Sequence, residues 1–321
     1  MKILVTDHSF PDLALETDLL EKAGIEVAVA QCGSTDAVIA AAAGCSALLV
    51  TYAPVDAAVL DARPEIGLVS RIGAGFDSVD THAAQTRGVW VANSPDYGSS
   101  EVALHALSLG LALGRRLNRF DADIRSGTWN AFAAGVPRRL AEMTVGVLGY
   151  GRIGSRFAYF AQSMFGQVLA HDPFCIDGDF APYVKPVGLD ELFERSDLVS
   201  IHVPLSSATR HLVGARLLDR MRPGSILVNT ARGAVVDLDA LIPRLAKFDG
   251  VGLDVLPIEP IPRDSPLLAA RNVILTPHAA WYTDSAEREL RRKAAQNIVS
   301  WMTVGRPDYP VVTGTRQAPG R

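Results

Sequence analysis

The feature that most constrains the fold is a regular alternation of short β-branched runs with helical stretches, which occurs twice along the 321 residues. In the first hundred residues, the runs suited to strands are 2–6, 26–29, 47–50, 67–70 and 89–91. The helical stretches between them end at Gly24, Gly44 and Gly88, which are suitable helix C-caps. Alternation of this kind predicts a parallel sheet with helices on both faces.

The same alternation restarts at residue 144 and continues to residue 275. Six further strands are predicted at residues 144–148, 167–170, 197–201, 225–228, 250–253 and 272–275. Six strands make a complete doubly wound dinucleotide-binding sheet, so the predicted fold class is α/β with two parallel-sheet domains. Between the two series, residues 99–118 are predicted to form one long helix, whose dense apolar content indicates burial between domains or subunits.

The C-terminal region is predicted to contain one more helix, at residues 284–302, that is free to pack on the first domain. Its apolar face would consist of Leu290, Ala294, Ile298 and Trp301. Its outer face would carry two i,i+4 ion pairs, Glu287 with Arg291 and Glu289 with Lys293. Residues 314–321 are predicted to be disordered.

Composition restricts the function classes. The 31 Lys and Arg residues against 35 Asp and Glu residues give a net charge of −4, so no surface for nucleic acid or for an anionic membrane is predicted. Cys32, Cys45 and Cys175 have no ligand spacing, so we expect neither disulfides nor a metal site, and a reducing, cytoplasmic location. The uncharged residues 37–55 are interpreted as helix, turn and buried strand, not as a membrane span, because Gly44 and Pro54 interrupt them.

A glycine-rich loop directly follows the predicted strand 144–148. The six residues Gly149, Tyr150, Gly151, Arg152, Ile153 and Gly154 have GxGxxG spacing and lead into a helical run. Gly149 would allow a tight turn, Gly151 the close approach of a pyrophosphate, and Gly154 the packing of the helix on the strand. The helix N-terminus would favour the phosphates. The loop therefore predicts a dinucleotide site, with a glycine turn of a generic α/β sheet as the alternative.

Asp172, at the end of the next predicted strand, indicates which dinucleotide would bind. It lies 23 residues after Gly149 and could accept hydrogen bonds from both hydroxyls of an adenine ribose, whereas its charge would repel a 2′-phosphate. No Arg or Lys follows it before Lys185. The sequence therefore favours NAD over NADP, and the alternative is that Asp172 is only a capping residue.

Three polar segments, residues 229–233, 254–260 and 276–281, follow the ends of later strands. They carry Arg232, Glu259 and His278, which core packing does not require. Ligands of open α/β sheets bind outside the carboxyl ends of the strands, so these three side chains are expected to converge there. Each residue alone is more often structural: a surface ion pair, a loop acid and a helix cap.

Taken together, these motifs resemble those of the D-isomer-specific 2-hydroxyacid dehydrogenases over nearly the whole chain. The matching segments are residues 71–80, 149–154, 196–205, 229–233 and 276–280. Residues 277–282 are especially similar to the C-terminal-binding-protein branch, which contains NAD-binding transcriptional corepressors as well as dehydrogenase-like proteins. The resemblance implies a Rossmann NAD-binding domain, residues 99–283, inserted into a flavodoxin-like substrate-binding domain, residues 1–98 and 284–321.

The resemblance also implies roles for individual residues. Arg232 would bind the carboxylate and carbonyl oxygen of the substrate. His278 would protonate the ketone oxygen or, in reverse, remove the hydroxyl proton, and Glu259 would orient His278 and favour its charged form. Asp254 would accept a hydrogen bond from the nicotinamide carboxamide, and backbone amides at Ala74 and Gly75 would hold the substrate carboxylate.

The remaining residues of the predicted site are assigned on the same basis. Cofactor contacts are expected from Gly149, Gly151, Arg152, Ile153, Gly154, Asp172, His202, Val203, Pro204, Thr209, Thr230, Ala231, Arg232, Asp254 and His278. Substrate contacts are expected from Tyr52, Arg71, Ala74, Gly75 and Trp281. Trp281 could equally be a hydrophobic cover for His278. His105, His171, His202 and His211 are interpreted as structural, although the turn at His202 is predicted to border the adenine.

These expectations lead to one function and two alternatives. The chain is predicted to be an NAD-dependent D-2-hydroxyacid dehydrogenase that interconverts a small 2-keto acid and a D-2-hydroxy acid. A corepressor-like protein that senses NAD(H), or a phosphonate (phosphite) dehydrogenase using the same residues, are the alternatives. A homodimer formed through residues 99–132, which include Trp129, is also predicted, because this apolar region needs a covering surface.

Overall fold

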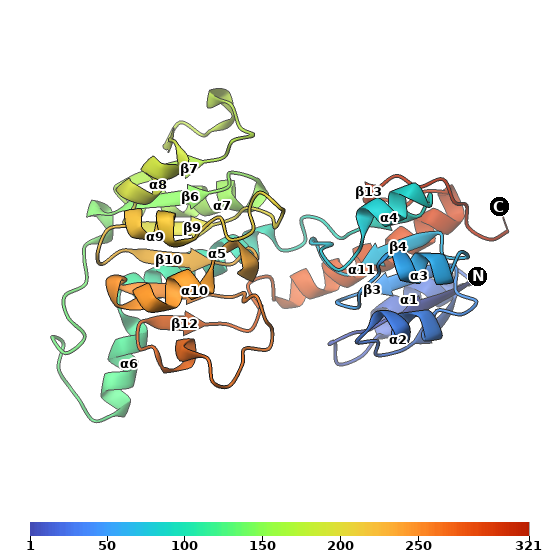
Figure 1. The fold of residues 1–321 in the computed structure, drawn as a ribbon, viewed down its shortest axis with the longest axis horizontal. Helices are drawn as coiled ribbons and strands as arrows, with labels where there is room; N and C mark the ends of the chain where they lie inside the picture. The colour runs from blue at the N-terminus through green and yellow to red at the C-terminus, as the bar shows by residue number, and fades with distance from the viewer. Residues whose placement is uncertain (321) are drawn as a thin grey trace. The chain divides into compact units, whose positions relative to one another are not determined.

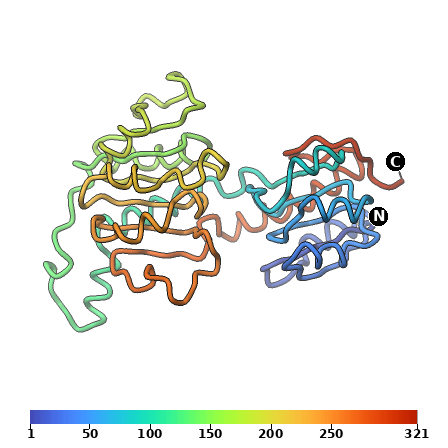
Figure 2. Tube along the Cα trace, viewed as in Figure 1, coloured from blue at the N-terminus to red at the C-terminus, as the bar shows by residue number. Residues whose placement is uncertain are grey.

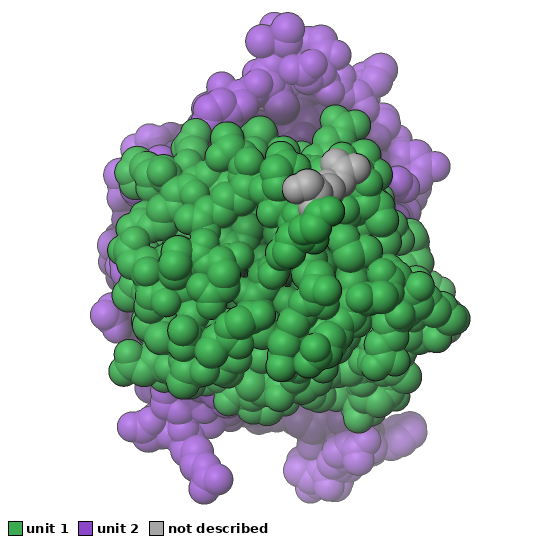
Figure 3. All heavy atoms as spheres, turned by 90° about the vertical axis from the view of Figure 1, so that its right-hand side faces the viewer, with its two compact units in different colours: residues 1–97, 283–321 green, residues 98–282 purple. Residues whose placement is uncertain are grey.

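The computed structural model describes residues 1–320, and the chain divides into two compact units, which Figure 3 colours separately. Unit 1 consists of Met1–Tyr97 and Thr283–Arg321, and unit 2 of Gly98–Tyr282. These limits lie within one residue of the predicted domain boundaries. Each unit has its own sheet and its own core, so each is described by itself.

The sheet of unit 1 is built from the first strand series and one C-terminal strand. Its strands are β1 (Lys2–Val5), β2 (Glu26–Val29), β3 (Ala47–Val50), β4 (Leu68–Arg71), β5 (Trp90–Ala92) and β13 (Pro310–Val312). The first five are parallel in the order β2-β1-β3-β4-β5, with Leu4 paired to Ala28 and Leu48. This is the flavodoxin-like order, and it confirms the predicted fold class. The antiparallel strand β13, on β5, was not predicted.

Helices cover both faces of this sheet (Figure 1). They are α1 (Ala14–Lys22), α2 (Thr35–Ala41), α3 (Ala57–Ala62), α4 (Thr81–Thr86) and α11 (Asp284–Val304). Helices α2, α3 and α4 enclose an apolar cluster that includes Val38, Val59 and Ala84, whereas α1 packs against α11. The glycines at 24, 44 and 88 have φ of 74°, 74° and 67°, as the predicted C-caps require.

Helix α11 buries its predicted apolar face against unit 1, and both predicted ion pairs form, at 3.0 and 2.7 Å. Their placement on an outer face is wrong, because Arg291 and Lys293 are buried. Arg291 makes a two-pronged ion pair with the buried Glu16 of α1, and the Nζ of Lys293 donates to the carbonyl of Pro95 at 2.7 Å. A buried cation requires such partners, and they lie too far along the chain for helix periodicity to predict.

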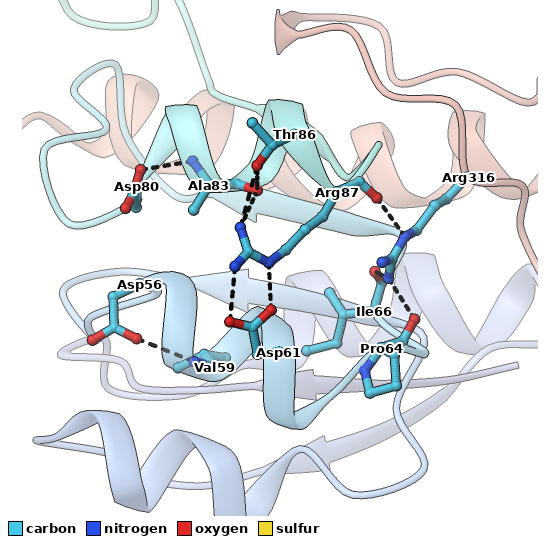
Figure 4. A network of polar contacts seen from close by, with 10 residues as sticks. All are labelled: Asp56, Val59, Asp61, Pro64, Ile66, Asp80, Ala83, Thr86, Arg87 and Arg316. Atoms are coloured by element: carbon cyan, nitrogen blue, oxygen red, sulfur yellow. Dashed lines mark hydrogen bonds and ion pairs between the residues drawn. The ribbon is translucent and has the colours of Figure 1, made fainter.

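The predicted disorder of the C-terminal tail is wrong for residues 314–320, and Arg321 lies outside the described residues. The guanidinium of Arg316 donates to the carbonyls of Pro64, Ile66 and Arg87, as Figure 4 shows. The carbonyl of Arg316 in turn accepts from the indole N–H groups of Trp90 and Trp301. These contacts pair polar groups of unit 1, most of them partly buried, with polar groups of the tail, so the tail is part of its structure.

The sheet of unit 2 has seven parallel strands. They are β6 (Thr144–Leu148), β7 (Gln167–His171), β8 (Val184–Pro186), β9 (Leu198–Ile201), β10 (Ile226–Asn229), β11 (Gly250–Leu253) and β12 (Val273–Leu275). Their order is β12-β11-β10-β9-β6-β7-β8, so the order in which strands are added along the sheet reverses between β6 and β9. Six of the strands were predicted, and the order is that of the Rossmann fold with one added strand. The short edge strand β8 was missed.

Two layers of helices cover this sheet, as Figure 1 shows. The α-helices of unit 2 are α5 (Ser99–Gly114), α6 (Leu117–Arg125), α7 (Arg152–Ala161), α8 (Leu189–Arg195), α9 (Ala215–Arg220) and α10 (Leu238–Leu241). Short 3₁₀ helices are η1 (Leu140–Glu142), η2 (Asp177–Asp179), η3 (Gly233–Val235), η4 (Ile242–Lys247) and η5 (Pro266–Ala269). Helices α5 and α7 share one apolar cluster with the sheet, and α8, α9 and α10 share the other.

The prediction of one helix over residues 99–118 is wrong in its C-terminal end and in what buries it. Helix α5 ends at Gly114, and Arg116 adopts a left-handed conformation, φ 57°, from which α6 begins. The buried side chains of α5, including Leu107 and Leu113, pack on the sheet of their own unit. Helix α6 and the segment after it extend away from that sheet (Figure 2), leaving Trp129 89% exposed.

Candidate active site

The glycine loop of unit 2 lies where the Rossmann fold binds its ligand, at the reversal of strand order between β6 and β9. Gly149 has φ of 92°, and a Cβ there would lie 2.9 Å from the carbonyl of His202, which follows β9. A Cβ on Gly154 would lie 1.9 Å from the Gly149 carbonyl. Gly149 is therefore required by the close approach of the turn after β9, and Gly154 by the close packing of α7 on the glycine loop itself.

Gly151 differs from these two glycines because a Cβ there would meet no described atom within 4 Å. It is the N-cap of α7, so the amides of Arg152 and Ile153 lie in the first turn of the helix. Open space in front of a helix N-terminus is the arrangement that accepts a pyrophosphate. The loop thus fits the dinucleotide that its sequence predicts.

Asp172 follows β7 and is held by the backbone. Its carboxylate accepts hydrogen bonds from the amides of Tyr150, at 2.8 Å, and Phe174, at 3.0 Å. The first of these amides belongs to the glycine loop, so the acid and the loop are fixed relative to each other. The carboxylate is half-buried and remains available to a ribose.

The turn after β9 is built mainly on internal contacts. The His202 ring packs on Phe157 of α7, with centroids 5.1 Å apart, and Nε2 lies 2.9 Å from the Ser200 hydroxyl. Burial lowers the pKa of His202 to about 3, so the ring is neutral. The Thr209 hydroxyl donates to the carbonyl of Pro204 at 2.6 Å and closes the turn. The His202 ring is therefore structural, and of the next two residues Val203 is half-buried and Pro204 is exposed.

The segment after β10 is shaped by the buried Asn229. Its side chain donates to the Arg232 carbonyl and accepts from the Ala231 amide, at 2.9 and 3.0 Å. A Cβ on Gly233 would lie 1.9 Å from the backbone of Leu256, so this segment presses against the next one. The buried hydroxyl of Thr230 has no hydrogen-bond partner within residues 1–320, as expected of a group that meets a ligand.

The segments after β11 and β12 bring Glu259 and His278 into direct contact. Oε2 of Glu259 lies 2.8 Å from Nδ1 of His278, and Oε1 accepts from the Leu256 amide at 2.8 Å. Burial raises the pKa of Glu259, but these hydrogen bonds and nearby Arg232 outweigh it and leave the pKa lowered. An ionised carboxylate only accepts, so Nδ1 carries a proton and Nε2 is left for a reacting atom.

His278 adopts a left-handed backbone, φ 54°, which is costly for a residue other than glycine. Asp254 holds it there. The Asp254 carbonyl accepts from the His278 amide at 2.8 Å, and its carboxylate accepts from the amides of Ala279 and Ala280, at 2.9 and 3.0 Å. The structure therefore gives Asp254 the role of fixing the His278 loop. Trp281 follows in that loop, with its ring edge-to-face on Tyr282.

The predicted substrate residues of unit 1 gather at the carboxyl ends of β3 and β4. The Arg71 guanidinium lies over the ring of Tyr52, 5.8 Å from its centroid, and a Cβ on Gly73 would collide with Arg71. The Ala74 carbonyl accepts from the Asn93 side chain at 2.7 Å, which fixes the loop that Ala74 shares with Gly75.

Sequence reasoning missed Asp7, at the end of β1. This buried carboxylate accepts from the amides of Thr51, Tyr52 and Ala53, at 3.1, 2.6 and 3.2 Å, and from the Thr6 hydroxyl. The rule that polar residues at the carboxyl ends of parallel strands share one edge could have identified it.

In residues 1–320, no group of three His, Cys, Asp or Glu side chains is placed to hold a metal ion. No helix in the same range is long and apolar enough to cross a membrane.

Comparison with known proteins supplies an independent line of evidence. The family model for the D-isomer specific 2-hydroxyacid dehydrogenase NAD binding domain matches residues 107–280. A glyoxylate reductase of Korarchaeum cryptofilum is 37% identical over 257 residues, which are 77% of this chain and 76% of that protein. A D-3-phosphoglycerate dehydrogenase of Archaeoglobus fulgidus is 34% identical over 313 residues, which are 96% of this chain and 58% of that longer protein.

A solved structure extends the similarity to the whole fold. D-lactate dehydrogenase of Aquifex aeolicus, complexed with NAD and lactic acid, superimposes with a TM-score of 0.88 at 28% identity. The match covers 98% of this chain and all of that one. The placement in the corepressor-like branch remains a prediction.

Proposed function

The chain belongs to the D-isomer-specific 2-hydroxyacid dehydrogenase family, and we propose that it interconverts a 2-keto acid and a D-2-hydroxy acid using NAD(H). The observation that carries this proposal is the 2.8 Å contact between Nδ1 of His278 and Glu259, on the same sheet edge as the glycine loop. An acid–base pair beside a dinucleotide cradle is what carbonyl reduction requires.

The residues that would hold the dinucleotide are those of the loop and its neighbours. The amides of Arg152 and Ile153 would bind the pyrophosphate, Asp172 the adenine ribose, and Thr230 and Ala231 the nicotinamide half. When bound, the nicotinamide supplies or accepts the hydride. Because the Asp172 carboxylate is fixed beside the loop, a 2′-phosphate would meet a negative charge, so we propose NAD in preference to NADP.

His278 would act through Nε2, because Nδ1 is committed to Glu259. In the reducing direction Nε2 gives its proton to the keto oxygen as negative charge develops there, and in the oxidising direction it takes the hydroxyl proton. Glu259 orients the ring and stabilises the imidazolium form. Both side chains are about one-third exposed, so the pair is accessible to a small molecule.

Arg232 would bind the substrate carboxylate and the carbonyl oxygen, since its planar guanidinium can donate to two acceptors at once. In unit 1, the groups proposed to bind the substrate carboxylate are the amides at Ala74 and Gly75, with Arg71 and Tyr52 beside them. Trp281 would line the side of the pocket that receives the substrate side chain.

The test is NADH oxidation across glyoxylate, hydroxypyruvate, phenylpyruvate and 4-methylthio-2-oxobutyrate. We expect turnover of at least one, and His278→Asn should lower kcat by about 10³-fold with little change in the Kd for NADH. The matched control is His82→Asn, on an exposed position of α4. If the wild-type protein reduces none of these acids, the proposed function is wrong.

We also propose that residues 99–132 form a homodimer contact. Leu117, Ile124, Trp129 and Phe132 are exposed in this region, and a second copy would cover them. Measuring the molecular mass with and without NADH tests both this contact and the alternative function. A mass that changes with NADH, in a protein without turnover, would favour the corepressor-like sensor.

A further inference from the structure

We propose that His105, on α5, is a positioning residue for His278 that acts through Thr276 and Asp254. The inference rests on the proposed function, because it assigns a further residue to the same acid–base site. All four residues belong to unit 2. His105 Nε2 lies 3.0 Å from the Thr276 hydroxyl, which lies 2.6 Å from Oδ1 of Asp254.

The direction of each hydrogen bond follows from counting protons. Oδ1 of Asp254 already accepts from the Ala279 amide and, as a carboxylate oxygen, donates nothing, so the single Thr276 proton points to it. The Thr276 oxygen must then accept from His105, which fixes the proton of His105 on Nε2. The hydrogen bonds therefore all point in one direction, from the imidazole through the hydroxyl to the carboxylate.

This series of hydrogen bonds leads to the strained backbone of His278. Asp254 contacts the His278 loop through its carbonyl and both carboxylate oxygens, and the Thr276 carbonyl also accepts from the His278 amide, at 3.0 Å. A left-handed conformation persists only where its surroundings determine it fully. If Thr276 loses its donor, its hydroxyl can rotate and Asp254 can shift, and the His278 loop is then held less tightly.

The location of His105 supports a positioning role over simple packing. Its side chain is about one-quarter exposed, so it is not a core residue. Nε2 also lies 3.7 Å from Oδ1 of Asp254, so the imidazole lies close to the carboxylate as well as to the hydroxyl. Helix α5 packs on β10 and β11, so the imidazole is anchored to the rigid part of the unit and not to another loop.

The variants that test this are His105→Leu, which removes the donor, and His105→Gln, whose amide N–H reaches about as far as Nε2. We expect His105→Leu to lower kcat about tenfold, because a displaced proton donor reacts more slowly, without changing the Kd for NADH. His105→Gln should restore most of kcat. Thr276→Val should match His105→Leu, and the double variant should show no further loss, since both break one chain.

Two further measurements separate the possible outcomes. The ring resonances of His278 in ¹⁵N-edited NMR, assigned with His278→Asn, should shift in His105→Leu and return in His105→Gln. This measurement does not depend on turnover, so it decides the role of His105 even if no keto acid is reduced and the proposed function fails. Ser108→Ala, one turn along the exposed side of α5, is the control that should leave both kcat and the resonances unchanged.

Unchanged resonances and kcat in His105→Leu would overturn the proposal. Equal losses of kcat and melting temperature in His105→Leu and His105→Gln would overturn it too, because a packing role predicts that the Gln variant gives no rescue.

Discussion

Asp7 in unit 1 and Asp254 in unit 2 both fix a loop through hydrogen bonds, but they fix different parts of it. Each is a buried carboxylate that follows a parallel strand. Each accepts hydrogen bonds from backbone amides of a loop that carries a predicted site residue. Asp7 holds the loop of Tyr52, whose side chain is 55% exposed, whereas Asp254 also binds the backbone of His278. From this difference we expect Asp7 to affect substrate binding at the surface that carries Tyr52, and Asp254 to affect His278, the single group proposed to react.

The strongest test of this difference is Asp254→Ala. It removes three hydrogen bonds to the carboxylate and lets the strained His278 backbone relax, so we expect kcat to fall about 100-fold or more. Asp254→Asn should be nearly as damaging, because the amide group would point N–H donors at the amides of Ala279 or Ala280. The control is Asp237→Ala, which removes a carboxylate that caps α10 through two amides. It should lower the melting temperature and leave kcat within twofold, and a comparable fall in kcat would contradict the assignment.

The corresponding change in unit 1, Asp7→Ala, should act on binding. Loss of the carboxylate frees the amides of Thr51, Tyr52 and Ala53, so the surface beside Arg71 is less ordered before the substrate arrives. We expect KM for the keto acid to rise about tenfold, with kcat reduced less than threefold and the Kd for NADH unchanged. Asp56→Ala, which removes the N-cap of α3, is the control. If Asp7→Ala lowers kcat as much as Asp254→Ala does, the contrast between the units is wrong.

Much of this arrangement could be predicted from the sequence, for a physical reason. Strand runs and glycine spacing are local, so both sheets and the glycine loop were predicted, and the rule on strand ends placed Glu259 and His278 together. What could not be predicted depends on partners distant in the chain. The burial of Arg291 requires Glu16, 275 residues away, and the order of the tail requires the carbonyls that Arg316 contacts. Strand β8 was missed because it has three residues, one of them Pro186.

Glu259 is expected to have a smaller effect, on the pH dependence of stability. Its side chain is partly exposed, whereas those of Asp7 and Asp254 are buried. Its pKa is lowered in the folded protein, so it stabilises the fold above its unfolded pKa, about 4.3, and this stabilisation is lost as pH falls through the folded value. The difference in unfolding free energy between wild type and Glu259→Gln should be constant from about pH 8 to 5 and narrow below about pH 4. Denaturant unfolding as a function of pH measures it. A difference that widens in acid would contradict the lowered pKa.

Substitution of Arg316 is expected to have the smallest effect on activity. It tests whether loss of any side chain that orders a loop of unit 1 lowers activity, whatever the loop carries. Arg316 reverses the chemistry of the two carboxylates: one guanidinium donates to the carbonyls of Pro64, Ile66 and Arg87, none of which is a predicted site residue (Figure 4). Arg316→Ala leaves these carbonyls without their donor and should reduce the unfolding free energy by about 3 kcal/mol, with kcat and KM unchanged. Asp61→Asn, which weakens the exposed ion pair with the neighbouring Arg87, should have no resolvable effect on either. If Arg316→Ala raised KM as Asp7→Ala does, general loosening of unit 1 would explain both, and Asp7 would have no specific role in binding.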